Sequence, residues 1–179
     1  LAADDGSVTT DYQRADVVLV GVSRSGKTPT CIYMAMQYGV FAANYPLTEE
    51  DFEGKQLPAM IRPQAARLFG LTIAPQRLQQ IRNERRPGSR YSSLAQCEYE
   101  VRCAEALFQR YGVPFLDTTE CSIEEIASRI IERKVAENPA VEHVKSISRP
   151  GMSLVYVELF ETERHAELVW QDVRGKLGA

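Results

Sequence analysis

Eight consecutive residues near the start of the sequence carry a pattern that suits phosphate binding. They are Gly21, Val22, Ser23, Arg24, Ser25, Gly26, Lys27 and Thr28, an unbroken G-x-x-x-x-G-K-T. The two glycines allow the backbone to turn tightly around a phosphate, whose oxygens then meet the loop N–H groups and the positive end of a helix dipole. The sequence therefore predicts a nucleotide phosphate cradle, a P-loop, at residues 21–28.

The last residues of this motif add side-chain chemistry. We expect Lys27 to neutralise the outer phosphates and to act as a catalytic residue, and we expect the Thr28 hydroxyl to coordinate Mg²⁺. Pro29 follows in the first turn of the predicted helix, where its missing N–H costs nothing. A nucleotide with bound Mg²⁺ is thus the expected ligand.

Asp117 is the second candidate catalytic residue, because it ends the short apolar run VPFLD. An acidic residue at a strand end near a P-loop can hold Mg²⁺ through water or accept a proton from a hydroxyl substrate. It can equally cap a loop beside Thr118 and Thr119. The residues leave both interpretations open.

Four arginines, Arg82, Arg85, Arg86 and Arg90, lie on a polar predicted helix and in the turn after it. A mobile lid built from this segment could deliver guanidinium groups to phosphate or to a phosphorylated partner. A solvated helix face explains the same pattern equally well, so both interpretations stay open.

Metal-binding and redox motifs are missing from the cysteine and histidine pattern. No C-x-x-C pair occurs, so zinc spacing is absent, and we expect reduced thiols. Both histidines fall late in the chain, which makes a histidine base for the predicted P-loop unit unexpected. The residues concerned are Cys31, Cys97, Cys103, Cys121, His143 and His165.

Strands and helices alternate around the motif. The Val-rich run at residues 15–20 is typical of a strand buried on both faces, and Gly39 and Gly112 are helix stop signals. The pattern predicts an α/β protein with a P-loop kinase-like parallel sheet covered by helices. Strands are expected at residues 15–20, 39–45, 68–73 and 113–117, and helices at 27–38, from Pro75, at 93–111 and at 123–134.

The pattern changes after Arg133. Two alternating runs flank Arg149, Pro150 and Gly151, which predicts an antiparallel hairpin, and a last amphipathic helix follows. We therefore expect two units: a nucleotide-binding domain at residues 1–135 and an appended hairpin–helix segment at 136–179.

Composition narrows the function classes. The 179 residues carry a formal net charge of −3, and no apolar run is long enough to span a membrane. We expect a cytoplasmic protein that binds neither nucleic acid nor membranes, and the possibility of a homo-oligomer stays open. Residues 1–16 are acidic and contain no signal peptide pattern, and the missing initiator Met suggests that the chain begins inside a longer protein.

Several ordered segments of residues 1–133 resemble one family. ADVVLVGVSRSGKTPT, AANYPL, LFGLTI, GSRYSSLAQCEYEV and VPFLDTTECSIEEIASRI are similar to the phosphoenolpyruvate synthase regulatory proteins, which include regulators of pyruvate, phosphate dikinase. The resemblance implies a bifunctional enzyme that uses ADP to phosphorylate a threonine of phosphoenolpyruvate synthase or pyruvate, phosphate dikinase. It also implies removal of that group with inorganic phosphate, which releases pyrophosphate.

The resemblance places the family's nucleotide-binding segment on residues 21–28, and ADP rather than ATP as the donor rests on it alone. Family members carry a further N-terminal domain that is not present in this sequence. The tail departs as well, since residues 136–179 resemble part of the porter region of resistance-nodulation-division efflux transporters.

Two other functions fit the same residues. A small-molecule kinase of the nucleoside monophosphate type shares the P-loop, the arginine-bearing segment and a late strand that ends in Asp. A nucleotide-binding module that has lost catalysis by truncation would keep only the loop. Phosphate transfer to a protein, to a small acceptor or to neither separates the three.

Overall fold

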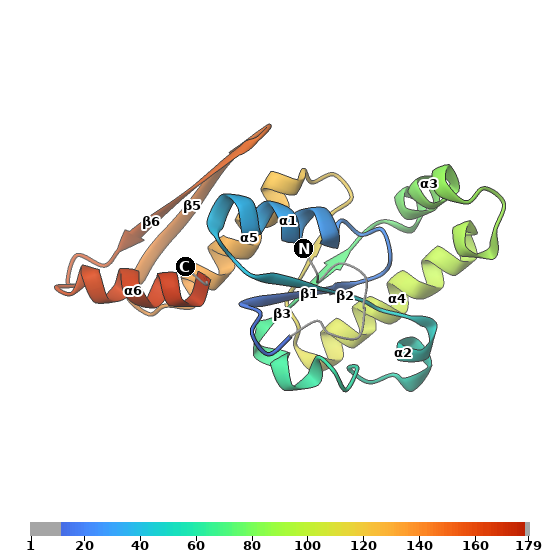
Figure 1. Cartoon of the computed structure of the whole chain (residues 1–179), viewed down its shortest axis with the longest axis horizontal. Coiled ribbons are helices and arrows are strands. Elements are labelled where there is room, and N and C mark those ends of the chain that lie inside the picture. Colours follow the sequence, from blue (N-terminus) through green and yellow to red (C-terminus); the bar gives the residue numbers. More distant parts are fainter. Residues whose placement is uncertain (1–11, 178–179) are drawn as a thin grey trace.

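The computed structural model describes residues 12–177, so the expected absence of an export signal lies largely outside the described residues. Four parallel strands form its main sheet in the order β2-β1-β3-β4 (Figure 1). They are β1 (Val17–Gly21), β2 (Ala42–Pro46), β3 (Leu68–Thr72) and β4 (Phe115–Asp117). The prediction of a parallel α/β sheet is confirmed.

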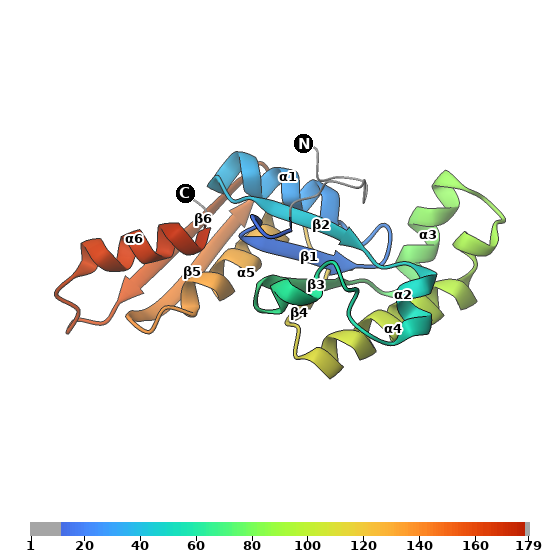
Figure 2. The ribbon, with the colours of Figure 1, turned by 60° about the horizontal axis from the view of Figure 1, so that its bottom comes forward.

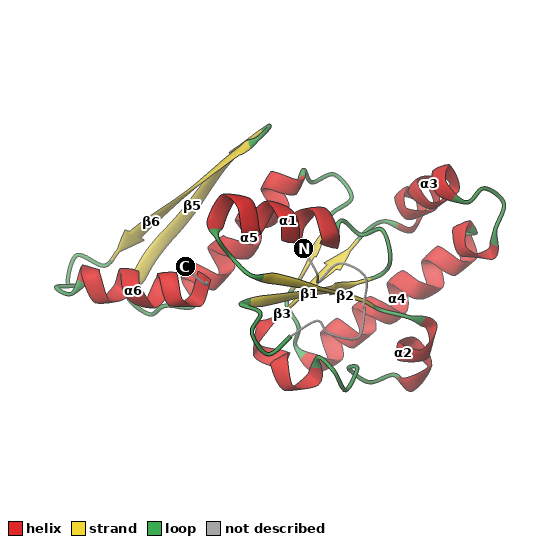
Figure 3. Ribbon diagram, viewed as in Figure 1, coloured by secondary structure: helices red, strands yellow, loops and turns green. Residues whose placement is uncertain are grey.

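Helices cover both faces of this sheet (Figures 1 and 3). In β1, Val18 and Val20 face a core shared with α4 (Leu94–Tyr111), whereas Val17 and Leu19 face α1 (Lys27–Tyr38) and α5 (Ile123–Ala136). All five residues of β1 are buried, because side chains alternate between two covered faces. The loop after β1 is thus attached to the best-buried strand of the molecule.

Local signals place most helix ends where the sequence predicts them. Ser93 and Ser122 cap α4 and α5, accepting hydrogen bonds from the backbone N–H groups of Gln96 and Glu125 at 3.3 and 3.2 Å. Gly112 ends α4 with a φ of 62°, which a residue with a side chain adopts only at a cost. The helix at Pro75 is α3 (Pro75–Arg85).

The segments between the strands contain more structure than the sequence analysis expects. Strand β2 begins at Ala42 rather than residue 39, since Gly39 and Val40 close α1 through bonds to Ala35 and Met34 carbonyls. Short helices appear at α2 (Glu49–Gly54), Arg62–Arg67 and Arg90–Ser92. Only α2 had a readable signal, the capping box of Thr48 and Asp51.

The tail forms the expected hairpin and helix, β5 (Val141–Arg149), β6 (Met152–Leu159) and α6 (Ala166–Leu177). It packs on α5, on the side that Figure 2 shows away from β1. Glu124 accepts a hydrogen bond from the N–H of Gly151 at 2.8 Å, and Ser128 bonds to Ser153. Helix α5 is therefore covered by the parallel sheet on one side and by the hairpin on the other.

A substitution at Gly70 in β3 tests how tightly the sheet packs against α4. A Cβ built there would lie 2.7 Å from Phe115 Cβ and 2.8 Å from the Phe108 ring. We expect Gly70→Ala to lower the free energy of unfolding by about 1–3 kcal/mol in urea titration, because the core is overpacked. Gly54→Ala, with nothing within 4 Å, is the control and should change it by no more than about 1 kcal/mol. Equal stability of the two variants would contradict this packing.

Candidate functional site

The loop at residues 22–26 joins the carboxyl end of β1 to the first turn of α1, and both motif glycines have a structural reason. A Cβ on Gly21 would lie 2.3 Å from the carbonyl oxygen of Leu71 in the neighbouring strand. Gly26 has a φ of 88°, in the left-handed region that favours glycine. The loop therefore has the strand–loop–helix path that the motif predicts.

Two side chains from distant elements hold loop carbonyls in place. Arg82 of α3 donates from Nη2 to the carbonyl oxygen of Ser23 at 3.2 Å. The hydroxyl of Thr118, just after β4, donates towards the carbonyl oxygens of Ser25 at 3.2 Å and Thr72 at 2.9 Å. Carbonyls that are held by the protein leave the opposite, N–H side of such a loop to face an anion.

Lys27 lies buried against the loop and bonds to its backbone. Its side chain is only 4% exposed, and Nζ donates to the carbonyl oxygen of Val22 at 2.7 Å. Burial lowers the pKa of Lys27 to about 7, with smaller opposing contributions from Cys31, which raises it, and Arg82, which lowers it. A phosphate oxygen beside Nζ would favour the charged ammonium and raise this pKa.

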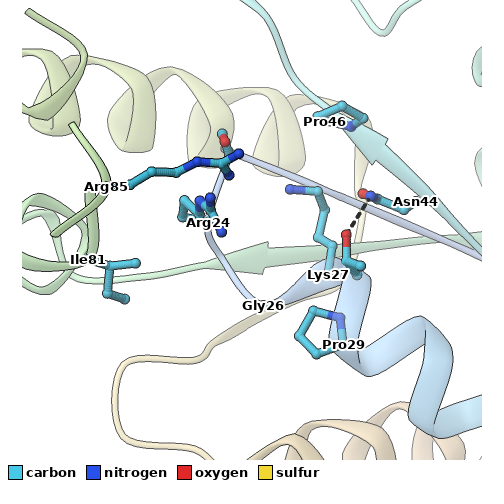
Figure 4. A pocket seen from close by; sticks show the side chains of 10 residues that line it. Arg24, Gly26, Lys27, Pro29, Asn44, Pro46, Ile81 and Arg85 are labelled. Carbon is cyan, nitrogen blue, oxygen red and sulfur yellow. Dashed lines mark hydrogen bonds between the residues drawn. The ribbon is translucent and has the colours of Figure 1, made fainter. Parts of the chain in front are cut away.

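The loop borders a cavity of about 410 Å³ (Figure 4). Residues of the loop and of the start of α1 form one wall, and β2 and α3 contribute to the others. Among the described residues, three basic side chains line it, Arg24, Lys27 and Arg85, and no carboxylate does. Such a lining favours an anionic ligand and disfavours a cationic one.

Thr28 lines the same cavity, and its hydroxyl oxygen accepts a hydrogen bond from the Asn44 amide at 3.1 Å (Figure 4). The described residues contain no group of three or more His, Cys, Asp or Glu side chains that could hold a metal ion. Mg²⁺ commonly keeps several waters and binds through few protein oxygens plus phosphate oxygens. The Thr28 hydroxyl could serve as one such protein ligand if phosphate oxygens and waters supplied the others.

Asp117 lies elsewhere. It is exposed at the end of β4, and its Oδ1 accepts hydrogen bonds from the N–H of Thr119 at 2.9 Å and its hydroxyl at 2.5 Å. It lines a separate hollow of about 380 Å³ between α3 and α4, together with Glu98 and Glu105. The structure thus brings residues 23, 24 and 26–28 together at one cavity and does not add Asp117 to them.

The four arginines have different surroundings. Arg82 is fully buried, where its Nη2 lies 2.6 Å from Glu100 Oε2 and its Cζ lies 4.2 Å from the centre of the Tyr91 ring. Arg82 therefore belongs neither to a mobile lid nor to a solvated helix face, because the side of α3 that carries it packs against α4. Arg85 reaches the cavity, whereas Arg86 and Arg90 are exposed.

Sequence analysis misses Arg82 and Thr118 as supports of the loop. A signal for Arg82 exists, since it lies four residues after Leu78 and therefore on the same, buried face of α3. Thr118 follows the predicted strand directly, but nothing in the sequence pairs it with Ser25. Their roles depend on partners 59 and 93 positions away.

The four cysteines are free thiols. Within residues 12–177, none of the helices combines the length and the apolar character needed to cross a membrane.

Fold and site together define an α/β protein whose parallel sheet carries a glycine-rich, lysine-containing loop between β1 and α1. The chain belongs to the Kinase/pyrophosphorylase family, whose model matches residues 1–131. Relatives from Pseudomonas fluorescens (strain Pf0-1) and Pseudomonas putida (strain F1) are 60% and 58% identical over 134 residues, 75% of this chain. Both are named "Putative phosphoenolpyruvate synthase regulatory protein".

The matched segment is 49% of each relative, so the chain spans about half the length of the curated relatives it matches. A relative from Marinobacter nauticus, with the same printed name, is 57% identical over 128 residues. No solved structure matches the chain significantly.

The buried ion pair behind the loop gives a stability prediction. Glu100→Ala leaves the Arg82 guanidinium buried without its carboxylate, so we expect the free energy of unfolding to fall by about 3–5 kcal/mol in chemical denaturation. Glu125→Ala breaks an exposed pair with Arg129 and should cost no more than about 1 kcal/mol. Similar losses for both variants would show that burial of Arg82 is not what makes the pair matter.

Lys27 gives a pH prediction. Its pKa is about 7 when folded and near its ordinary 10.5 when unfolded, so between these values the unfolded chain binds the extra proton. Lys27 therefore makes the free energy of unfolding rise with pH in that window, by up to about 1.4 kcal/mol per pH unit. Urea titrations at pH 7, 8, 9 and 10 should show this slope in the wild type and lack it in Lys27→Met. Identical slopes would contradict the lowered pKa of Lys27 in the folded chain.

Proposed function

We propose that this chain is the nucleotide-binding and phosphate-transferring part of a regulator of phosphoenolpyruvate synthase or pyruvate, phosphate dikinase. The observation that carries the proposal is the cavity beside the loop at residues 21–28, with three cationic side chains and no carboxylate. Family membership supports kinase and pyrophosphorylase chemistry in general, and the names of the relatives support the target enzyme.

In the kinase direction, a threonine hydroxyl of the target attacks the β-phosphorus of ADP. The bond from that phosphorus to the bridging oxygen breaks, AMP leaves, and the hydroxyl proton is released. In the other direction, an oxygen of inorganic phosphate attacks the phosphorus of phosphothreonine, which yields pyrophosphate and the free threonine. Both directions move one phosphoryl group between two oxygen atoms.

Little covalent chemistry falls to the protein in such a transfer, so positioning and charge stabilisation carry it. The loop N–H groups and Lys27 would bind the phosphates, and the Thr28 hydroxyl would hold Mg²⁺. When bound, Mg²⁺ neutralises negative charge on the phosphate oxygens. Asp117 is the proposed acceptor of the threonine proton, and it would act from the separate hollow that it lines with Glu98 and Glu105.

The test uses ADP radiolabelled at its β-phosphate, Mg²⁺ and purified phosphoenolpyruvate synthase. We expect label on a threonine of the target with the wild type and none with Lys27→Ala, whose ADP affinity in calorimetry should fall by about 1.5–3 kcal/mol, the value of a charged hydrogen bond. Asp117→Asn should bind ADP normally and transfer poorly. Lys145→Ala, an exposed change on the hairpin, is the control.

The outcomes separate the candidate functions. Unchanged ADP affinity of Lys27→Ala would contradict the phosphate cradle. Label on a small acceptor without the protein target would favour the small-molecule kinase. ADP binding with transfer to neither acceptor would make the chain a nucleotide-binding module, and a parallel reaction with ATP tests which nucleotide is the donor.

A further inference from the structure

We propose that Arg24 and Arg85 form a clamp for the outermost phosphoryl group of the ligand in the loop cavity. This inference rests on the proposed function, and it names the two side chains that would distinguish a diphosphate from a monophosphate. Both arginines line the cavity, Arg24 from the loop and Arg85 from the last turn of α3. In Figure 4 their guanidinium groups lie on the same side of the cavity.

Lys27 lies deeper in the cavity than the two arginines. The Lys27 side chain is 4% exposed, and its Nζ lies against the carbonyl oxygen of Val22, so it can reach a ligand only from the floor. Arg24 and Arg85 are exposed side chains at the rim. A ligand phosphate held by the loop N–H groups and Lys27 is therefore the inner one, and the arginines meet whatever lies further out.

The charges of the two arginines are uncompensated. Among the described residues, ion pairs join Arg82 to Glu100 and Arg90 to Glu49, but neither Arg24 nor Arg85 takes part in one. Two guanidinium groups at one cavity repel each other, and no lining carboxylate offsets the repulsion. An anion between them would remove this cost and could accept paired hydrogen bonds from each planar group.

The backbone at Arg24 supports the same conclusion. Arg24 has a φ of 78°, the left-handed region that residues with side chains rarely adopt. Its neighbours in the loop hold it there, since Arg82 fixes the carbonyl of Ser23 and Thr118 fixes that of Ser25. Strained backbone of this kind clusters at active sites and ligand clamps. From this position the side chain of Arg24 lines the cavity.

The outermost phosphoryl group is also the one that an acceptor can reach from the rim. In the proposed reaction it is the β-phosphoryl group of ADP or the phosphoryl group of phosphothreonine. Charge on its oxygens is spread during transfer, and guanidinium groups stabilise such charge well. Arg24 and Arg85 would then hold the group that moves. In this proposal Lys27 holds the inner phosphate, rather than the outer phosphates that its place in the motif suggests.

Calorimetry with Mg²⁺ and four ligands tests the clamp: AMP, inorganic phosphate, ADP and pyrophosphate. We expect Arg85→Gln to weaken ADP and pyrophosphate at least tenfold and to change AMP and inorganic phosphate less than twofold. Arg24→Gly should do the same, and because it also relieves the positive φ it should not unfold the loop. Arg86→Gln, one residue beyond Arg85 and outside the cavity lining, is the matched control and should leave all four affinities within twofold.

Equal weakening of monophosphates and diphosphates by Arg85→Gln would overturn the clamp, because it would mean a general charge effect. Unchanged ADP and pyrophosphate affinity would overturn it as well. Failure of the proposed function looks different: the wild type then transfers no label to phosphoenolpyruvate synthase, while the selective loss of pyrophosphate in Arg85→Gln still supports the clamp. A wild type that binds none of the four ligands overturns both.

Discussion

Backbone carbonyls in the loop after β1 need hydrogen-bond donors, and the rest of the site depends on where those donors come from. A loop that turns its N–H groups towards an anion must satisfy its carbonyls on the other side. Here the side chains of three residues donate hydrogen bonds to these carbonyl oxygens: Lys27 to Val22, Arg82 to Ser23, and Thr118 to Ser25. To reach the Ser23 carbonyl, Arg82 must be buried. A buried guanidinium without a carboxylate is costly, and Glu100 supplies that carboxylate.

The sheet positions these donors around the end of β1. Strand β1 lies between β2 and β3, so its carboxyl end is flanked by Pro46 of β2 on one side and by the segments that lead to α3 and Thr118 on the other. Helix α5 contacts both the loop after β1 and the hairpin of the tail. Its Ile123 and Ile126 lie next to Gly26 of the loop, and its Glu124 holds the turn of the hairpin. The hairpin thus contacts the same helix that borders the loop, although it lies on the side of α5 away from β1 (Figure 2).

Sequence patterns predict the parts of this protein that short-range physics determines. The strand at β1, the loop glycines, and the Ser93 and Ser122 caps each depend on residues within a few positions of one another, so they can be read directly. The roles of Arg82 and Thr118 cannot be read in this way, because their partners are distant in the chain. Asp117 shows the same limit: its place at a strand end was predictable, but which cavity it borders depends on how α3 and α4 pack.

The distances along the chain between the loop and its supports bear on how the molecule folds. Residues 21–28 come before every element that holds them in place except β1. The contacts to Ser23 and Ser25 close stretches of 59 and 93 residues, so they can form only after α3 and the segment after β4 have reached the sheet. A partly folded chain can possess a complete β1 and α1 and still lack the side chains that hold the loop between them.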